Sequence, residues 1–115
     1  MSCLNSIILE GVATNKPELK ETVNGLVCLV NISVSRKCKG LDGNYIDDEV
    51  SCFDIEAFGN LAEFCASKIK QDREIRLAGR LKQSKWKNSD NNECSKVVII
   101  AEHIELKPMK KEGAK

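Results

Sequence analysis

Trp86 is the only tryptophan of the chain, and it lies in a segment where cationic side chains alternate with apolar ones. From Glu74 to Trp86, most even-numbered residues are polar or charged, whereas the odd-numbered ones are apolar up to Leu81. Because residues two apart in a strand share a face, this alternation predicts Trp86 on the polar face. The cations nearby are Arg80, Lys82, Lys85 and Lys87. An exposed ring among cations suits a surface that stacks on an unpaired base and contacts phosphates.

Two alternatives to base stacking stay open for Trp86. The ring could cap the end of a barrel, or it could fill an interface between subunits. A single bulge between Leu81 and Trp86 would also turn the ring to the other face of the strand. The alternation of side chains by itself does not choose among these interpretations.

Phe58 is a second candidate stacking residue, at the end of the alternating segment Val50–Phe58. It shares the predicted outer face with Asp54 and Glu56, whose carboxylates repel phosphate. The ring therefore either stacks on a base or is shielded by a neighbouring loop or helix.

A cationic cluster, formed by Arg36, Lys37 and Lys39, follows the second long apolar segment. As a functional group, these residues would clamp phosphates. As a structural one, they would be a solvated strand end whose charges resist pairing with another strand edge. We keep both interpretations open.

Catalytic and metal-binding patterns find little support. The chain has six cysteines but no C-x-x-C pair, and His103 is its only histidine. Such scattered ligands do not match the spacing of zinc sites, and the glycines near Cys38 lack the spacing of a phosphate loop. We therefore expect no catalytic residues, no cofactor and no metal, with cysteines that are reduced.

The composition is that of one small globular domain. The chain has 115 residues, of which 42% are hydrophobic and 30% charged. No apolar run approaches the roughly 18 residues of a membrane span, and no signal peptide opens the chain. We therefore expect a cytoplasmic protein without a membrane partner. Four lysines against one glutamate give residues 107–115 a net charge of +3, which leaves −2 for residues 1–106. Any nucleic-acid surface must therefore be a local basic patch.

The order of the predicted elements is three strands, one helix and two strands. The predicted strands are Ser6–Val12, Gly25–Arg36, Val50–Phe58, Glu74–Lys85 and Lys96–Leu106. The helix is predicted over Asn60–Lys70, with Asn60 as its N-cap. This order fits a five-stranded OB-fold barrel, with the helix between strands three and four. A β-sandwich is the competitor, and the single helix argues against it. We expect the barrel domain to span residues 1–106 and residues 107–115 to form a basic, flexible tail.

Five short motifs, in this order and at this spacing, resemble the bacterial single-stranded DNA-binding protein family. They are Asn5–Gly11, Pro17–Lys20 with Asn24 and Gly25, Phe58–Glu63, Leu77–Leu81, and Lys85 with Trp86. The resemblance implies an OB fold, a homotetramer and a nucleoid-associated role in binding single-stranded DNA during replication, recombination and repair. It places the stacking aromatics on Phe58 and Trp86 and backbone-binding cations on Arg36, Lys82 and Lys85.

The chain also departs from the family pattern. Cys38 and Cys52 stand where the family usually has stacking aromatics, and Asp54 stands at an often basic groove position, with Glu56 as a further negative charge. Val12 replaces a common arginine or asparagine. The family's acidic C-terminal tip, which recruits repair proteins, is not present in this sequence. We therefore expect ssDNA binding that is weaker and more sensitive to salt than is typical.

These departures leave three functional hypotheses. The first is a general ssDNA-binding protein. The second is a primosome-type accessory protein, an OB-fold dimer that mainly binds replication proteins, which the missing aromatics favour. The third is an OB module that binds only proteins. The match around Gly79–Trp86 favours the first hypothesis.

Overall fold

The structure is a computed structural model. It describes the backbone of residues 3–39, 41, 43 and 45–108, and the side chains of these residues other than 37–39 and 45–48. The elements are β1 (Ile7–Ala13), β2 (Glu18–Thr22), β3 (Gly25–Lys39), β4 (Tyr45–Phe58), α1 (Asn60–Lys68), β5 (Glu74–Lys87) and β6 (Glu93–Leu106).

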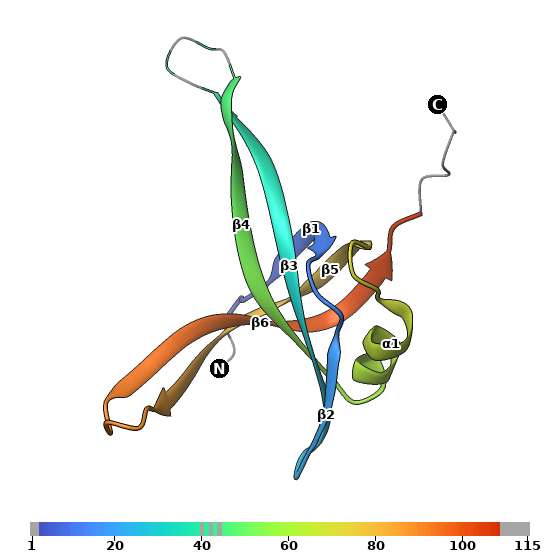
Figure 1. The fold of residues 1–115 in the computed structure, drawn as a ribbon, viewed down its shortest axis with the longest axis vertical. Helices are drawn as coiled ribbons and strands as arrows, with labels where there is room; N and C mark the ends of the chain where they lie inside the picture. Colours follow the sequence, from blue (N-terminus) through green and yellow to red (C-terminus); the bar gives the residue numbers. More distant parts are fainter. Residues whose placement is uncertain (1–2, 40, 42, 44, 109–115) are drawn as a thin grey trace.

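Five of the strands close into a barrel. The strand order is β1-β5-β6-β4-β3-β2, and an additional pairing between β1 and β3 closes the ring. The pairing of β4 with β6 is parallel and short, joining Ile55 to Ile99 and Glu56 to Ile100. The helix α1 lies between β4 and β5 in the chain and packs beside the barrel (Figure 1). The predicted five-stranded OB fold with its single helix is confirmed.

The barrel interior is filled by branched apolar side chains from alternate positions of the strands. The largest fully buried ones include Ile32, Ile55, Ile75, Leu77 and Ile99. Ala62 and Cys65 from α1 join the same cluster. Burial of these aliphatic side chains is the main stabilising contribution to the fold.

The barrel wall has no room for a side chain at Gly79. A Cβ atom at Gly79 would lie 2.1 Å from the backbone oxygen of Ile100. The ladder between β5 and β6 shifts register at this point, because Ala78 faces His103 while Gly79 faces Ala101. The residue left over is Glu102, which forms a bulge in β6.

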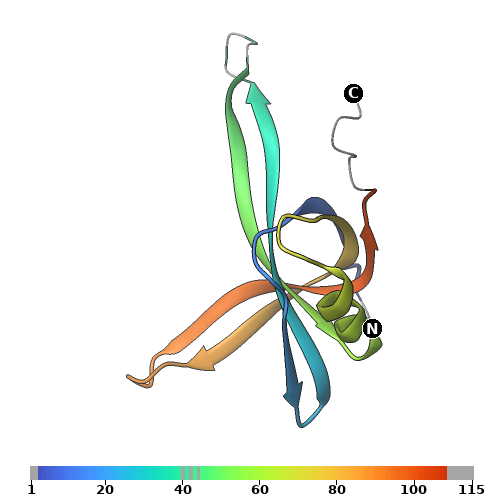
Figure 2. The ribbon, with the colours of Figure 1, turned by 45° about the vertical axis from the view of Figure 1, so that its right-hand side comes forward.

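Three two-stranded ribbons project from the barrel. They are formed by β2 with β3, by β3 with β4 and by β5 with β6 (Figures 1 and 2). The observed strands exceed the predicted ones mainly in these ribbons: β4 begins at Tyr45 and β6 at Glu93. A projecting ribbon exposes both faces to water, so its sequence lacks the apolar alternation from which a strand is predicted.

The predicted element order is wrong in one respect, because β2 precedes the long strand β3. All five residues of β2 are exposed, and the strand is held by backbone pairing with β3 from Glu18↔Leu29 to Thr22↔Gly25. A strand without a buried face carries no hydrophobic pattern.

The predicted first residue of the helix, Asn60, is confirmed, but the predicted N-cap and the predicted last residue, Lys70, are wrong. Gly59, with φ of 64°, is the N-cap, and Asn60 is the first helical residue. Glycine adopts this backbone conformation without steric cost, so no side-chain cap is needed to turn the chain. At the other end the helix stops at Lys68, and the N–H of Ile69 donates to the oxygen of Cys65.

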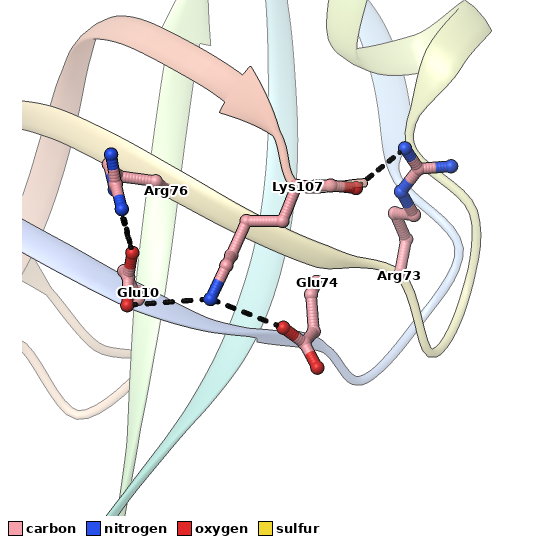
Figure 3. Close-up of polar contacts among 5 residues, drawn as sticks. All are labelled: Glu10, Arg73, Glu74, Arg76 and Lys107. Carbon is pink, nitrogen blue, oxygen red and sulfur yellow. Dashed lines mark hydrogen bonds and ion pairs between the residues drawn. The ribbon is translucent and has the colours of Figure 1, made fainter. Parts of the chain in front are cut away.

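The chain that follows β6 is bound to the barrel by polar contacts (Figure 3). The backbone N–H of Lys107 donates to the oxygen of Glu74 at 3.1 Å, and Arg73 donates to the oxygen of Lys107 at 2.9 Å. The Lys107 ammonium lies 3.6 Å from Glu10 and 3.5 Å from Glu74. Of the predicted tail 107–115, residues 109–115 lie outside the described residues, and the boundary at residue 106 stays a prediction.

Candidate nucleic-acid interface

Trp86 lies near the end of the β5–β6 ribbon, on the face that the alternation predicts. Between Gly79 and Lys87 the ladder with β6 is continuous, so no bulge separates Leu81 from Trp86. Trp86 pairs with Cys94 and is 45% exposed. Because neighbours two apart share a face, Trp86 is in line with Arg80 and Lys82, and its predicted face is confirmed.

The four predicted cations of β5 divide between its two faces. Arg80 and Lys82 share the face of Trp86, whereas Lys85 and Lys87 lie on the other face, opposite Ser95 and Glu93. Arg80 lies 3.8 Å from Glu102, the bulged residue of β6. Among the residues that the structure describes, Lys82, Lys85 and Lys87 take part in no ion pair, so their charges are available to a ligand. A hollow of about 480 Å³ at the ribbon end is lined by residues including Lys85, Trp86, Lys87 and Cys94.

Phe58 is the last residue of β4, opposite Val27, and its side chain is 47% exposed. The following N–H, of Gly59, donates to the oxygen of Leu26 and fixes the turn into α1. The ring is therefore half covered and half available, which leaves its stacking role a prediction.

Asp54 has two polar partners in the structure. It pairs with Asn31 across the β3–β4 ladder and accepts a hydrogen bond from the Asn31 amide. On its other side the Lys96 ammonium of β6 lies 2.7 Å from the second carboxylate oxygen. The hydrogen bond from Lys96 and, to a smaller extent, that from Asn31 lower the pKa of Asp54, although partial burial raises it. The pKa of Lys96 is raised in turn by Asp54.

Lys96 is a residue of this surface that the sequence did not single out. The hairpin register could have found it: Trp86 faces Cys94 and Ser84 faces Lys96, so Lys96 and Trp86 share a face. Counting back from the turn near Asp90 gives this pairing directly. The surface that carries Trp86, Arg80, Lys82, Lys96 and Asp54, drawn from β4, β5 and β6, is called the Trp86 face below.

Arg36 lies apart from the Trp86 face. It is exposed and pairs with Glu49, on the side of the β3–β4 ribbon opposite to Asn31 and Asp54. The predicted residues Lys37, Cys38 and Lys39 belong to β3, but their side chains lie outside the described residues. Cys52, in contrast, is exposed on the same face of β4 as Asp54.

The described cysteines differ in burial, and Cys94 is half-buried. Cys28 and Cys65 are fully buried in the barrel core, where burial raises the pKa of both thiols, that of Cys65 to about 12. These two behave as small hydrophobes, as expected. Cys3 and Cys52 are exposed. Within the described part of the chain, no three potential ligands gather into a metal site, and no helix is long and apolar enough to cross a membrane.

Comparison with known structures supports the fold. A Plasmodium falciparum SSB in complex with ssDNA superposes with a TM-score of 0.82 at 17% identity, covering 94% of this chain and 98% of that one. A deletion mutant of the single-stranded DNA binding protein from Thermus aquaticus gives a TM-score of 0.80 at 22% identity, covering 91% of this chain and 51% of that one. At these identities the likeness shows the fold alone.

Sequence comparison reaches further than the fold. The chain is 30% identical to the single-stranded DNA-binding protein of Treponema pallidum, over 92% of this chain and 59% of that protein. It is 31% identical to the protein of the same name from Aquifex aeolicus, over 90% of this chain and 69% of that protein. The chain thus spans between 59% and 69% of the length of these two relatives. The profile of the single-strand binding protein family matches residues 4–107. This chain belongs to the single-strand binding protein family.

Proposed function

We propose that this chain binds single-stranded DNA without sequence preference and without catalysing a reaction, in replication, recombination and repair. The observation that carries the proposal is Trp86, a half-exposed ring in line with Arg80 and Lys82. Stacking on a ring does not depend on the identity of the base, and lysine and arginine contact any phosphate. The names of the relatives describe the binding of single-stranded DNA by those proteins.

The proposed site combines two stacking rings with cations from two faces. Trp86 and Phe58 would stack on bases, and Arg80 and Lys82 would contact phosphates beside Trp86. The remaining predicted cations, which would follow the strand around the ribbons, are Arg36, Lys37, Lys39, Lys85 and Lys87.

We further propose that the chain assembles as a homotetramer in a nucleoid-associated cytoplasmic pool. An unpaired strand edge supports self-association. One edge of β1 pairs with β5, but its other edge pairs with β3 only at Val12 and Ala13, so over residues 7–11 this second edge has no partner among the described residues. Ile8, on this strand, is 72% exposed. Unpaired strand edges and exposed apolar side chains are typical of association surfaces.

One observation favours the primosome-type alternative. Asp54 and Glu56 put negative charge on the outer face of β4, and Cys52 provides no ring there. A protein with this surface could bind mainly to replication proteins and touch ssDNA only weakly. The alternative predicts a dimer.

The decisive test is the binding of oligo-dT by wild type and Trp86→Ala. In the wild type, quenching of the single tryptophan reports contact directly, because no second tryptophan contributes. In the variant, which lacks this signal, the anisotropy of a labelled oligo-dT gives the affinity on the same scale for both proteins. We expect Trp86→Ala to bind about 5- to 150-fold more weakly, which corresponds to about 1–3 kcal/mol for one stacked base.

Trp86→Phe is the matched control, because it keeps an aromatic face in the same strand position. It should retain most of the affinity that Trp86→Ala loses. Equal binding by wild type and Trp86→Ala would refute stacking on this ring, and absence of binding by the wild type at low salt would refute the proposed function.

A further inference from the structure

Asp54 occupies the middle of a three-strand surface and uses both of its carboxylate oxygens. One accepts a hydrogen bond from Asn31 of β3, and the other lies 2.7 Å from the Lys96 ammonium of β6. A DNA phosphate, like this carboxylate, could accept hydrogen bonds from an amide and an ammonium through two of its oxygens. The carboxylate therefore stands where a phosphate could bind.

Lys96 is a cation close to the stacking ring on its own face. It pairs with Ser84, while Trp86 pairs with Cys94, which makes Lys96 and Trp86 diagonal neighbours on one face of the ribbon. Diagonal neighbours in an antiparallel ladder lie about 7–8 Å apart, within the reach of a lysine side chain. Lys82 lies four residues from Trp86 along β5 and is more distant by register.

The ion pair is open to solvent. The Lys96 side chain is 52% exposed and that of Asp54 is 44% exposed. An ion pair this exposed is screened by salt and contributes little to stability, so a competing anion can open it without disturbing the barrel.

We propose that Asp54 is an internal competitor of DNA phosphate for Lys96, and that this ion pair sets the affinity and the salt dependence of the site. The inference rests on the proposed ssDNA-binding function. In the free protein Lys96 is neutralised by Asp54. In the complex Asp54 still holds Lys96, so Lys96 makes no contact with a phosphate. Loss of the Asp54 charge would free Lys96 for that contact.

This competition changes the salt dependence in a defined direction. A lysine that contacts single-stranded DNA adds about 0.7 to the slope of log affinity against log salt, because it displaces a condensed cation from the DNA. If Asp54 keeps Lys96 from making that contact, the wild-type slope lacks this contribution. The pair thus weakens binding but flattens its salt dependence, whereas the sequence alone suggested weaker and more salt-sensitive binding.

The test is a double-mutant cycle, measured as the anisotropy of labelled oligo-dT over a series of NaCl concentrations. Asp54→Asn should tighten binding about 3- to 10-fold at low salt and steepen the slope by about 0.7, the effect of one added phosphate contact. In a Lys96→Met background, Asp54→Asn should lose most of the gain and all of the added slope. Lys96→Met alone should leave the wild-type slope unchanged, because it removes no phosphate contact. Asp54→Ser serves as a second variant in case the Asn31 contact tolerates asparagine poorly.

Glu56→Gln is the matched control. It removes one negative charge two residues away on the same face of β4, but Glu56 forms no ion pair among the residues described. It should tighten binding by general electrostatics, with a smaller dependence on Lys96 than Asp54→Asn shows, because the charge of Glu56 acts on Lys96 less than that of Asp54 does.

Two outcomes would overturn the inference while leaving the proposed function intact. The first is an equal effect of Asp54→Asn with and without Lys96. The second is an Asp54→Asn effect no larger in slope than that of Glu56→Gln. Absence of oligo-dT binding by the wild type and all variants would instead refute the proposed function, and the inference with it.

Discussion

At the scale of single residues, what a carboxylate does on this protein depends on its partners. Glu10 and Asp54 are both exposed enough to meet solvent, yet each is held by cations. The hydrogen bond and charge of Arg76, followed by the charge of Lys107, lower the pKa of Glu10 (Figure 3). The Arg76 guanidinium and the Glu10 carboxylate lie 2.5 Å apart. The ion pair that joins β1 to β5 therefore depends on the protonation state of the Glu10 carboxylate.

This coupling predicts a contribution of Glu10 to acid unfolding. Its native pKa lies below its ordinary value of 4.5, so the unfolded chain binds the proton more readily. The contribution to stability is therefore fully present above that ordinary value, and it is lost as the pH falls through the native pKa. We expect the melting temperature of Glu10→Gln to fall less between about pH 5 and pH 3 than that of the wild type. Circular dichroism melts across this range measure it.

Glu21→Gln is the control for this prediction. Glu21 is exposed on β2 and takes part in no ion pair in the described part of the chain. Its substitution should leave the pH dependence of melting as in the wild type. Identical pH profiles for wild type and Glu10→Gln would contradict the proposed coupling.

At the scale of elements, the β5–β6 ribbon positions the site. Its inner half belongs to the barrel wall, and its outer half carries Trp86 beyond the barrel (Figure 1). The register of the outer half follows from the bulge at Glu102, because the ladder runs without interruption from Gly79 to Lys87. The position of the stacking ring therefore depends on close packing at Gly79.

Gly79→Ala tests this dependence. A methyl group there would meet the Ile100 oxygen at 2.1 Å, so one of the two strands must shift. We expect a loss of about 1–3 kcal/mol in the free energy of unfolding, the usual cost of overpacking a well-packed position. Urea denaturation measures it. Gln83→Ala, at an exposed position of the same strand, should change stability by no more than about 0.5 kcal/mol. Equal stability of Gly79→Ala and wild type would contradict this prediction, because it would show that β5 and β6 accommodate the methyl group without cost.

At the scale of the whole molecule, the projecting ribbons make the protomer extended. Its radius of gyration is 16.8 Å, whereas a compact domain of this length has about 13 Å. Ribbons and an open β1 edge expose backbone and apolar surface that assembly would cover. This agrees with the proposed tetramer.

Light scattering of the free protein measures the assembly. The proposed homotetramer predicts four times the protomer mass of 12.8 kDa. Twice that mass would favour the primosome-type alternative. Ile8→Lys, which charges the exposed side of β1, should lower the assembled mass if this strand forms the interface. Ile8 is exposed in the protomer, so the substitution should leave the fold of the barrel intact.

The sequence predicted those parts of the fold that bury apolar side chains. The five barrel strands alternate because one face of each packs inside, and Trp86 could be assigned to a face by the same argument. The sequence did not predict β2, which buries nothing, or the extended ribbon ends. It placed the helix N-cap on Asn60, because a polar side chain was expected to cap the first turn. In the structure Gly59 is the N-cap, and its backbone conformation turns the chain into the helix without a side-chain hydrogen bond.

The candidate site was predicted less completely than the fold. Trp86, Arg80 and Lys82 follow from alternation within one strand. The contact of Asp54 with Lys96 could not be predicted that way, since it joins two strands whose parallel pairing comes only from barrel closure. Side chains that meet across a non-local pairing leave no spacing signal in the sequence.

The closure of the barrel by its first strand has a consequence for how the protein is made. Ile7 pairs with Gly79, and the Asn5 side chain exchanges two hydrogen bonds with the backbone of Leu81, 76 residues later. When β1 leaves the ribosome, β5, its main partner, has not yet been synthesised. The hairpins β3–β4 and β5–β6 form from neighbouring segments, but the ring waits for nearly the whole chain. Most of nascent β1, which pairs only with β5, therefore remains unpaired for most of translation, and folding is complete only after β6 emerges.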